Sequence, residues 1–222
     1  MTNNRVLIVA ASPIEVQHLL SKSEKTNEHL YSVPGFAINV DLLITGIGTT
    51  SMTYFLTKQL NDKKYNFALL VGIAGAYSQS FKLGDLVNVN SERFADMGII
   101  KDDSFTDFFD MNLEDANKFP FENKILKNYS LINNAAINKL PTAKGNTVNS
   151  IRTNILPHIQ QNTDVESMEG ASFAFVCSQH PMAYAQIRAI SNYVGQQDKK
   201  LWNISLAVKN LHKLINEVLI II

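Results

Sequence analysis

Three polar side chains stand where strand-like runs of the sequence end. Glu15 follows the run 5–11, Glu169 follows the run 164–168, and Asn192 follows the run 183–191. In open α/β sheets ligands bind beyond the carboxyl ends of the strands. A carboxylate there can orient and deprotonate a water, or accept hydrogen bonds from two neighbouring hydroxyls, and a carboxamide offers both donors and acceptors. These residue types suit the capture of a sugar diol and of the polar edge of a base.

Each of the three also has a purely structural explanation. Ser12, Pro13 and Glu15 form the pattern of a helix capping box with proline at the first helical position. Glu169 precedes Gly170 and a helical pattern, where a carboxylate is stabilised by the helix dipole. Asn192 is a residue type common in turns. The residues alone leave both explanations open.

A glycine-rich run follows another predicted strand. Residues 46–51 read Gly-Ile-Gly-Thr-Thr-Ser and precede a helical pattern, as a dinucleotide-binding turn would. The sixth position is Ser51 rather than the glycine of that fingerprint, so a Rossmann site is disfavoured. The free N–H groups of the helix start could still hold a small anion or a water.

The sequence lacks the motifs of several other catalytic and metal-binding sites. The sequence has no Gly-x-Ser-x-Gly elbow, no His-Glu-x-x-His motif and no Cys-x-x-Cys pair, and its five histidines are scattered, so we expect no metal site. A rich phosphate clamp is hard to build because the chain has few arginines. They are Arg5, Arg93, Arg152 and Arg188.

Short apolar β-branched runs alternate with helical patterns, which is typical of a sheet covered by helices. We expect a single α/β domain over residues 1–222, without repeats or linkers. The predicted strands are 5–11, 37–45, 67–72, 84–90, 142–149, 164–168 and 183–191, and the predicted helices are 13–21, 50–61, 170–178 and 204–220, the last capped by Asn203.

The amino-acid composition limits the class of protein and the compartment that we expect. Apolar residues make up 45% of the 222 residues, charged residues make up 18%, and 20 basic residues balance 20 acidic ones. We therefore expect a globular protein that binds neither nucleic acid nor membrane. Cys177 is the single cysteine, which favours the reducing cytoplasm. The aspartate- and phenylalanine-rich segment 101–122 is predicted to be a solvated loop with aromatic anchors, placed at a subunit interface.

Four blocks of the sequence resemble the purine nucleoside phosphorylase and nucleosidase superfamily over nearly the whole chain. They are Ala10-Ala11-Ser12-Pro13-Ile14-Glu15-Val16; two glycine loops, Thr45-Gly46-Ile47-Gly48 and Gly72-Ile73-Ala74-Gly75-Ala76; Val165-Glu166-Ser167-Met168-Glu169-Gly170; and Arg188-Ala189-Ile190-Ser191-Asn192. The last block, followed by Trp202-Asn203-Ile204, is most similar to the futalosine hydrolase branch. The resemblance implies a three-layer α/β/α sandwich, nucleoside phosphorylase-like, around a mixed central β-sheet.

The same resemblance implies a reaction and its residues. It implies hydrolysis of a purine nucleoside, futalosine to hypoxanthine plus dehypoxanthine futalosine in menaquinone biosynthesis, by a homodimer or higher homo-oligomer that uses water and needs no metal or organic cofactor. Glu15 would activate the water and Glu169 would hold the ribose hydroxyls. The implied substrate-binding residues are Met168 against the sugar, Gly75 and Val148 along the base, and Ile47 and Gly48 in the first glycine loop.

Asn192 predicts which base is released. The adenosine-type nucleosidases carry aspartate at this position, which can protonate N7 of a 6-aminopurine, whereas a carboxamide cannot act as that acid at neutral pH. A carboxamide can donate to O6 and accept from N7–H, so we expect hypoxanthine or guanine over adenine.

Other functions remain as alternatives. One is a purine nucleoside phosphorylase or a methylthioadenosine/S-adenosylhomocysteine nucleosidase. An inactive nucleoside-binding protein and a flavin- or dinucleotide-binding module are more remote. The scarcity of arginine favours water over phosphate as the nucleophile, with Arg93 the one nearby candidate. The 5′-substituent of the nucleoside is not determined by the sequence.

Overall fold

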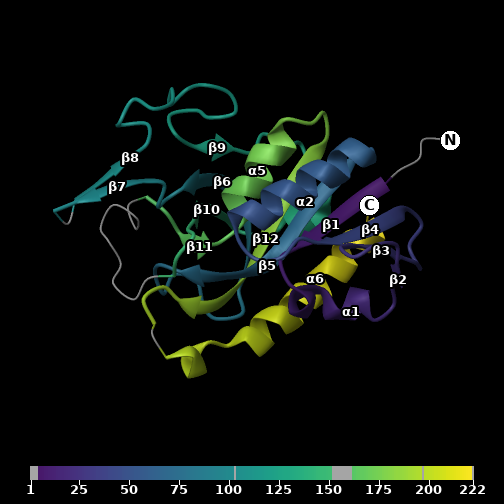
Figure 1. Cartoon of the computed structure of the whole chain (residues 1–222). Coiled ribbons are helices and arrows are strands. Elements are labelled where there is room, and N and C mark those ends of the chain that lie inside the picture. Colours follow the sequence, from purple (N-terminus) through teal and green to yellow (C-terminus); the bar gives the residue numbers. More distant parts are fainter. Residues whose placement is uncertain (1–4, 103, 152–161, 197, 222) are drawn as a thin grey trace.

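A mixed β-sheet runs through the centre of the protein in the computed structural model, which describes residues 5–102, 104–151, 162–196 and 198–221 (Figure 1). From one edge to the other the strands follow the order β11, β10, β6, β12, β5, β1, β4, β3, β2, and β9 pairs with β6. Their bounds are β11 (Val165–Ser167), β10 (Thr142–Thr147), β6 (Leu86–Phe94), β12 (Ala183–Tyr193), β5 (Phe67–Ala76), β1 (Arg5–Ala10), β4 (Asn39–Ile44), β3 (Leu30–Val33), β2 (Glu24–Lys25) and β9 (Leu126–Lys127).

Helices cover both faces of this sheet, which confirms the predicted three-layer α/β/α arrangement. Figure 1 shows α2 and α5 side by side on one face, with α6 and α1 on the other. Each face has its own apolar core, because the buried strands β1 and β5 present valine, leucine and isoleucine alternately to the two sides. The helical elements are η1 (Pro13–Val16), α1 (Gln17–Leu20), α2 (Thr49–Asp62), α3 (Ala135–Asn138), α5 (Gly170–Ser178), η2 (Lys199–Leu201) and α6 (Ile204–Ile221).

The C-terminal helix α6 follows its sequence pattern closely. Leu211, Ile215 and Val218 are buried on the face that packs on β12 and β5. The side chain of Asn203 accepts a hydrogen bond from the backbone N–H of Leu206 at 3.2 Å, as the capping prediction requires. No helix of the described residues is long and apolar enough to cross a bilayer.

One half of the sheet closes on itself. The short strand β11 pairs in parallel with β10 on one side and antiparallel with β5 on the other. Strands β5, β12, β6, β10 and β11 therefore form a ring, filled by small and branched side chains such as Ala74, Val89 and Ile190. This closure brings the strand ends that follow Gly75, Glu166 and Ser191 to the same place.

A β-bulge in β12 sets the direction of Asn192. Ile190 is paired with Ala74 on β5, but the next residue of β5, Gly75, is paired with Asn192, so Ser191 is the extra residue. Because side chains alternate along a strand, a bulge reverses which face the following residues point to. Asn192 therefore shares a face with Gly75 rather than with Ala74.

The structure corrects several details of the sequence-based elements. The second expected glycine loop, Gly72–Ala76, is the last part of strand β5, because its backbone pairs with β12 and β11. The predicted helix 13–21 is a 3-10 turn, η1, followed by the short α1. The short strands β2, β3, β7, β8 and β9 and the helical segments α3 and η2 were not predicted.

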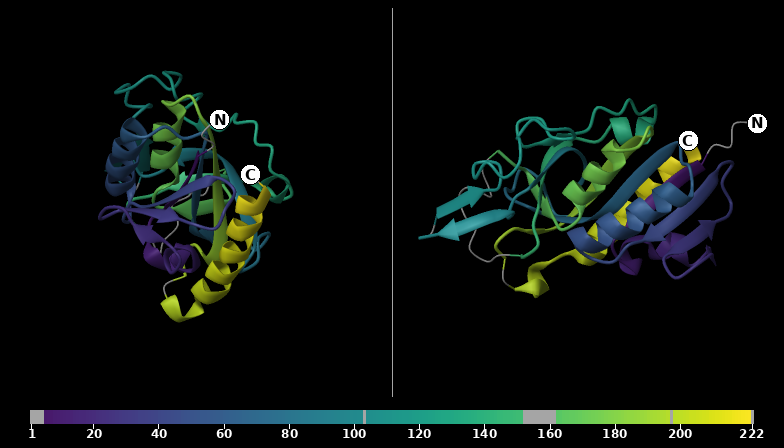
Figure 2. Two further views of the ribbon diagram at one scale, coloured as in Figure 1. Left: turned by 90° about the vertical axis from the view of Figure 1, so that its right-hand side faces the viewer. Right: turned by 45° about the horizontal axis from the view of Figure 1, so that its top comes forward.

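The segment 101–122 is only partly a loop. Strands β7 (Gly98–Lys101) and β8 (Ser104–Asp107) form a hairpin that projects from the body of the protein (Figure 2). Phe109 and Phe121 are buried against the core shared with α5, as aromatic anchors would be, whereas Phe119 is exposed. Its placement at a subunit interface stays a prediction.

Candidate active site

A cavity of about 180 Å³ lies at the strand ends brought together by the closed half of the sheet. It contains most of the site residues predicted from the sequence, although they are up to 177 positions apart, Glu15 against Asn192. The predicted residues that line it are Glu15, Ile47, Gly75, Val148, Met168, Glu169 and Asn192. Gly48 does not line it, but its N–H donates to Glu169.

Glu15 is held at the floor of the cavity by three hydrogen bonds. Its Oε2 accepts from the backbone N–H and the hydroxyl of Ser12, both at 2.9 Å, and its Oε1 accepts from Ile73 N–H at 3.0 Å. The capping interaction therefore exists, and it does not compete with a functional role, because a carboxylate has about four acceptor positions. Burial raises the pKa of Glu15, and nearby Arg188 opposes that rise.

The side chain of Glu169 does not cap its own helix. Its Oε1 accepts from Gly48 N–H at 3.0 Å, and its side chain makes no capping bond at the start of α5. The helix N–H of Ala171 donates instead to the hydroxyl of Thr147, at 2.7 Å. Glu169 is still the N-cap residue of α5, where the helix dipole favours a negative charge, and its carboxylate lines the cavity as well.

The glycine turn before α2 gives Glu169 its donor. Gly46 and Gly48 have φ angles of 88° and 92°, a conformation that favours glycine. Ile47 between them is largely exposed and lines the cavity rim. The N–H of Gly48, the N-cap residue of α2, thus donates to a carboxylate of the protein itself.

Arg188 was the main omission of the sequence analysis, which assigned it to a strand and no further. It lies on β12 with 1% of its surface exposed, and its Nη1 is 3.6 Å from Glu169 Oε2 and 3.4 Å from the carbonyl oxygen of Ile73. A side chain on Gly72 would meet Nη1 of Arg188 and Oε1 of Glu15 at 2.5 and 2.8 Å, so this glycine makes room for both. A charged residue inside an apolar strand was the available signal.

Asn192 presents its carboxamide beside Gly75. Its Oδ1 accepts from the hydroxyl of Ser191 at 2.7 Å, which leaves Nδ2 as the end directed to other acceptors, with a weak 3.3 Å bond to its neighbour's carbonyl. A Cβ on Gly75 would approach Asn192 Nδ2 to 3.1 Å. The absence of a side chain at Gly75 keeps this end of the cavity open.

Glu166 is a third carboxylate on the cavity wall, and no role for it is predicted from the sequence pattern. Its Oε2 accepts from the hydroxyl of Tyr77 at 2.6 Å. Burial raises its pKa. Trp202, which lies shortly before α6, also lines the cavity.

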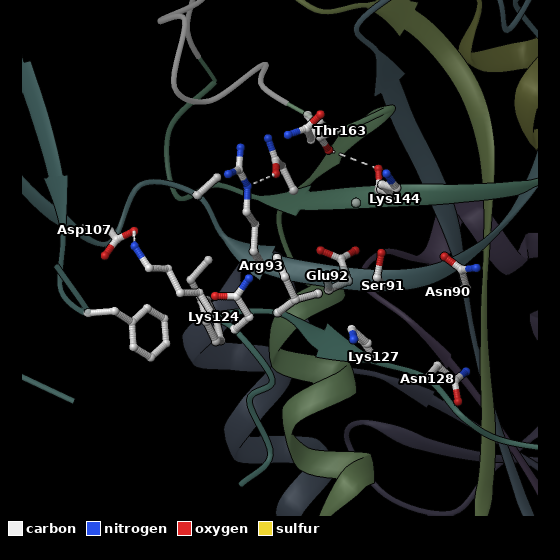
Figure 3. A pocket seen from close by; sticks show the side chains of 18 of the residues that line it. Asn90, Ser91, Glu92, Arg93, Asp107, Lys124, Lys127, Asn128, Lys144 and Thr163 are labelled. Carbon is white, nitrogen blue, oxygen red and sulfur yellow. Dashed lines mark hydrogen bonds and ion pairs between the residues drawn. The ribbon is translucent and has the colours of Figure 1, made fainter. Parts of the chain in front are cut away.

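Arg93 lies elsewhere. It lines a separate polar hollow of about 830 Å³, where its Nε donates to Asn146 at 2.7 Å. Figure 3 shows this hollow. In that view Arg93 lies between its neighbour Glu92 on one side and the hydrogen-bonded pair Lys124 and Asp107 on the other. Arg152 falls outside the described residues. Among the described residues no group of three or more histidine, cysteine, aspartate or glutamate side chains could hold a metal ion.

Comparisons with solved structures identify the fold. A methylthioadenosine/S-adenosylhomocysteine nucleosidase from Colwellia psychrerythraea, solved with adenine, superposes with a TM-score of 0.78 at 18% identity, over 98% of this chain and 95% of that one. The futalosine hydrolase of Helicobacter pylori superposes with a TM-score of 0.77 at 13% identity, over 97% of each chain. Residues 142–220 match the family model described as the phosphorylase superfamily. The chain has the phosphorylase-superfamily fold.

The sequence is similar to those of futalosine hydrolases. It is 28% identical to that of Thermus thermophilus over 80% of each chain. It is 24% identical to that of Streptomyces coelicolor over 77% of this chain and 74% of the relative. The superfamily match covers β10 to α6, and thus Glu169, Arg188 and Asn192.

Proposed function

We propose that this protein hydrolyses the N-glycosidic bond of a 6-oxopurine nucleoside, and that its substrate is futalosine, released as hypoxanthine and dehypoxanthine futalosine. The observation that carries the proposal is one cavity lined by Glu15, Glu169 and Asn192. The likeness to futalosine hydrolases over most of the chain supports this substrate. The pathway assignment to menaquinone synthesis follows from the substrate.

Glu15 and Glu169 have different roles at the sugar. Breaking the bond between C1′ and N9 leaves positive charge on the ribose and sends the bonding electron pair to the base. Glu169 accepts hydrogen bonds from the 2′- and 3′-hydroxyls, and Met168 packs on the ring. Glu15 accepts a proton from the water whose oxygen forms the new bond to C1′. Preorganised charges of this kind stabilise the oxocarbenium-like transition state.

Arg188 favours the ionised form of Glu15. It lowers the pKa of Glu15 against the effect of burial, and it contacts Glu169. An ionised Glu15 is the form that can take a proton from water, so the guanidinium supports the base without touching the substrate. Arg188 acts as a positioning residue.

Asn192 forms hydrogen bonds with the departing base. Its Nδ2 donates to O6, where the developing negative charge of a 6-oxopurine gathers, and Oδ1 accepts from N7–H. The departing base takes its proton from solvent. A 6-aminopurine offers no carbonyl oxygen for this donor. An unpaired polar group in a base pocket costs roughly several kcal/mol of binding free energy.

Water is the proposed nucleophile because the described arginines do not surround the cavity as a phosphate clamp. Arg93 contributes to the separate hollow of Figure 3, and Arg188 is already engaged by Glu169. The alternative within the fold is phosphorolysis, or cleavage of methylthioadenosine or S-adenosylhomocysteine.

One experiment separates these activities. The purified protein is incubated with futalosine, inosine and methylthioadenosine, with and without phosphate, and the released base and sugar are identified. We expect hypoxanthine and a free reducing sugar at the same rate in both buffers. Release of a sugar 1-phosphate, or adenine as the principal product, would reject the proposal.

A catalytically inactive nucleoside-binding protein is the alternative outside enzymes. Glu169→Ala distinguishes them, since a hydrolase loses turnover while a binding protein has none to lose. Failure of the wild-type protein to cleave any of the three nucleosides would favour the binding protein.

We also propose that the protein works in the cytoplasm as a homodimer or higher homo-oligomer. The single cysteine, Cys177, is buried and free, in keeping with a reducing compartment. Apolar side chains of α2 and of the segment before β9, among them Tyr54, Met97 and Leu113, are exposed around one broad hollow. Light scattering of the purified protein tests the oligomeric state, and a monomer at micromolar concentration would reject it.

A further inference from the structure

Five residues form a row across the closed half of the sheet. Arg93 of β6 is paired with Asn146 of β10, Asn146 with Glu166 of β11, Glu166 with Gly75 of β5, and Gly75 with Asn192 of β12. Residues directly opposite each other on neighbouring strands share a face of the sheet. Glu166 and Asn192 therefore stand on the same face, on either side of a residue that has no side chain.

Glu166, Gly75 and Asn192 line the same cavity, and the space between the Glu166 and Asn192 side chains is here called the gap. Glu166 and Asn192 are two strand spacings apart, roughly 10 Å between backbones. That span accommodates the N1-to-N7 edge of a purine together with a hydrogen bond at each end. A Cβ at position 75 would lie 3.0 Å from the Val194 side chain and 3.1 Å from Asn192 Nδ2, so these neighbours would have to move slightly to admit it.

A chain of hydrogen bonds fixes the orientation of Glu166. Tyr77 donates its hydroxyl proton to Glu166 Oε2 at 2.6 Å and accepts from Asn146 Nδ2 at 3.1 Å. Asn146 in turn accepts from Arg93 Nε at 2.7 Å. Each bond in this chain donates in the direction of the carboxylate, so Oε2 is engaged by Tyr77 while Oε1 keeps its acceptor positions, and Glu166 lines the cavity.

We propose that Glu166 is a specificity-determining residue that accepts a hydrogen bond from N1–H of a 6-oxopurine held between it and Asn192. A 6-oxopurine carries a proton on N1, whereas a 6-aminopurine carries a lone pair there, which a carboxylate repels. Glu166 and Asn192 thus read two neighbouring positions of the same base edge. The inference rests on the proposed function, because it assigns one more contact to the same nucleoside.

Burial of Glu166 favours such a contact. The side chain is half-buried, burial raises its pKa, and its one bond from Tyr77 lowers it. A further donor from the base would satisfy the remaining acceptor positions of a carboxylate that is partly removed from water. In the row of paired residues Asn146 stands between Arg93 and Glu166. Glu166 therefore does not pair directly with Arg93.

Glu166→Gln tests the assignment sharply. The Tyr77 hydroxyl needs an acceptor, so the new amide turns its oxygen to Tyr77 and its NH₂ to the gap. The amide then opposes N1–H of hypoxanthine and complements N1 of adenine. We expect the ratio of kcat/KM for futalosine over its 6-amino analogue, and for inosine over adenosine, to fall by about tenfold or more. Binding of free hypoxanthine and adenine, measured by calorimetry, should shift in the same directions.

Three controls complete the experiment. Glu122→Gln removes a surface carboxylate that pairs with Lys127 and Tyr129, and it should leave the ratio unchanged. Tyr77→Phe keeps the carboxylate but frees its orientation, and it should lower the ratio less than Glu166→Gln does. 1-Methylinosine lacks N1–H, so wild-type protein should discriminate against it and Glu166→Ala should discriminate less.

The outcomes separate the two proposals. If wild-type protein cleaves 6-oxopurine nucleosides and Glu166→Gln retains their preference over 6-aminopurine nucleosides and the wild-type affinity for hypoxanthine, Glu166 does not read N1–H, while the proposed function stands. If wild-type protein cleaves none of the nucleosides, the proposed function fails first, and the calorimetry with free bases still tests Glu166.

Discussion

Arg188 Nη1 lies 3.6 Å from Glu169 Oε2, in a place where the guanidinium is 1% exposed and the Glu169 side chain is 6% exposed. Burial raises the pKa of Glu15, and the same guanidinium opposes that rise. A single buried cation therefore connects the carboxylate proposed to activate water with the carboxylate proposed to hold the ribose. The geometry of the site depends on this residue although it does not line the cavity.

Arg188→Met should damage both stability and activity. Removing one partner of a buried ion pair leaves the other charge uncompensated, which costs about 3–5 kcal/mol of unfolding free energy. Urea unfolding of the variant beside wild type and Arg188→Lys measures this cost, and Arg188→Lys should recover part of the loss. Equal midpoints for wild type and Arg188→Met, with equal turnover, would contradict the role given to Arg188.

Glu169→Gln should reduce cleavage only where the sugar hydroxyls are present. Loss of charge-assisted hydrogen bonds to the 2′- and 3′-hydroxyls weakens transition-state binding, by roughly 100-fold or more in kcat/KM for inosine. The variant and the wild type should differ little on 2′,3′-dideoxyinosine, a poor substrate for both. An equal loss on both nucleosides would point to misfolding of the site rather than to lost ribose contacts.

Glu15→Gln should remove the acid limb of the pH profile. Glu15 must be ionised to take a proton from water, so kcat/KM rises with pH through its pKa, which burial places above the ordinary value of 4.5. The substitution should lower kcat by about 10²–10⁴-fold at neutral pH. A wild-type profile flat from pH 4.5 to 7.5, or an unchanged limb in the variant, would exclude Glu15 as the base.

Glu92→Gln should stabilise the protein more at alkaline pH than at acidic pH. Glu92 is fully buried, accepts from Gln186 Nε2 at 2.7 Å and Thr147 Oγ1 at 3.0 Å, and burial raises its pKa to about 7. Between 4.5 and 7 the folded state holds a proton that the unfolded state has lost, so stability falls as pH rises through about 7.

Thermal or urea unfolding at pH 5 and pH 8 measures this effect. The advantage of Glu92→Gln over wild type should grow between the two pH values by on the order of 2–3 kcal/mol. Exposed Glu122→Gln serves as the matched control and should show no such trend. A constant difference across the range would mean that Glu92 does not change its charge there.

Local sequence patterns were sufficient to predict most helices and strands, and to select the residues that line one cavity in the structure. Apolar periodicity places β1, β4 and α6 within a few residues of their bounds, and Asn203 caps α6 as expected. Glu15, Glu169 and Asn192 were selected because each follows a strand, and strand ends of an α/β sheet lie together. These features depend on neighbours only a few positions away, which a sequence shows directly.

The tertiary structure alone decided what those residues face. The bulge at Ser191 that directs Asn192 toward Gly75, the pairing of β11 with β5 that brings Glu166 to the cavity, and the burial of Arg188 against Glu169 all arise between segments far apart in the chain. Strand register and ion pairing across the sheet depend on which strands become neighbours, and the local periodicity of a sequence contains no such information. The sequence determined which groups stand at the ends of the strands, and the closed sheet decided which of them meet.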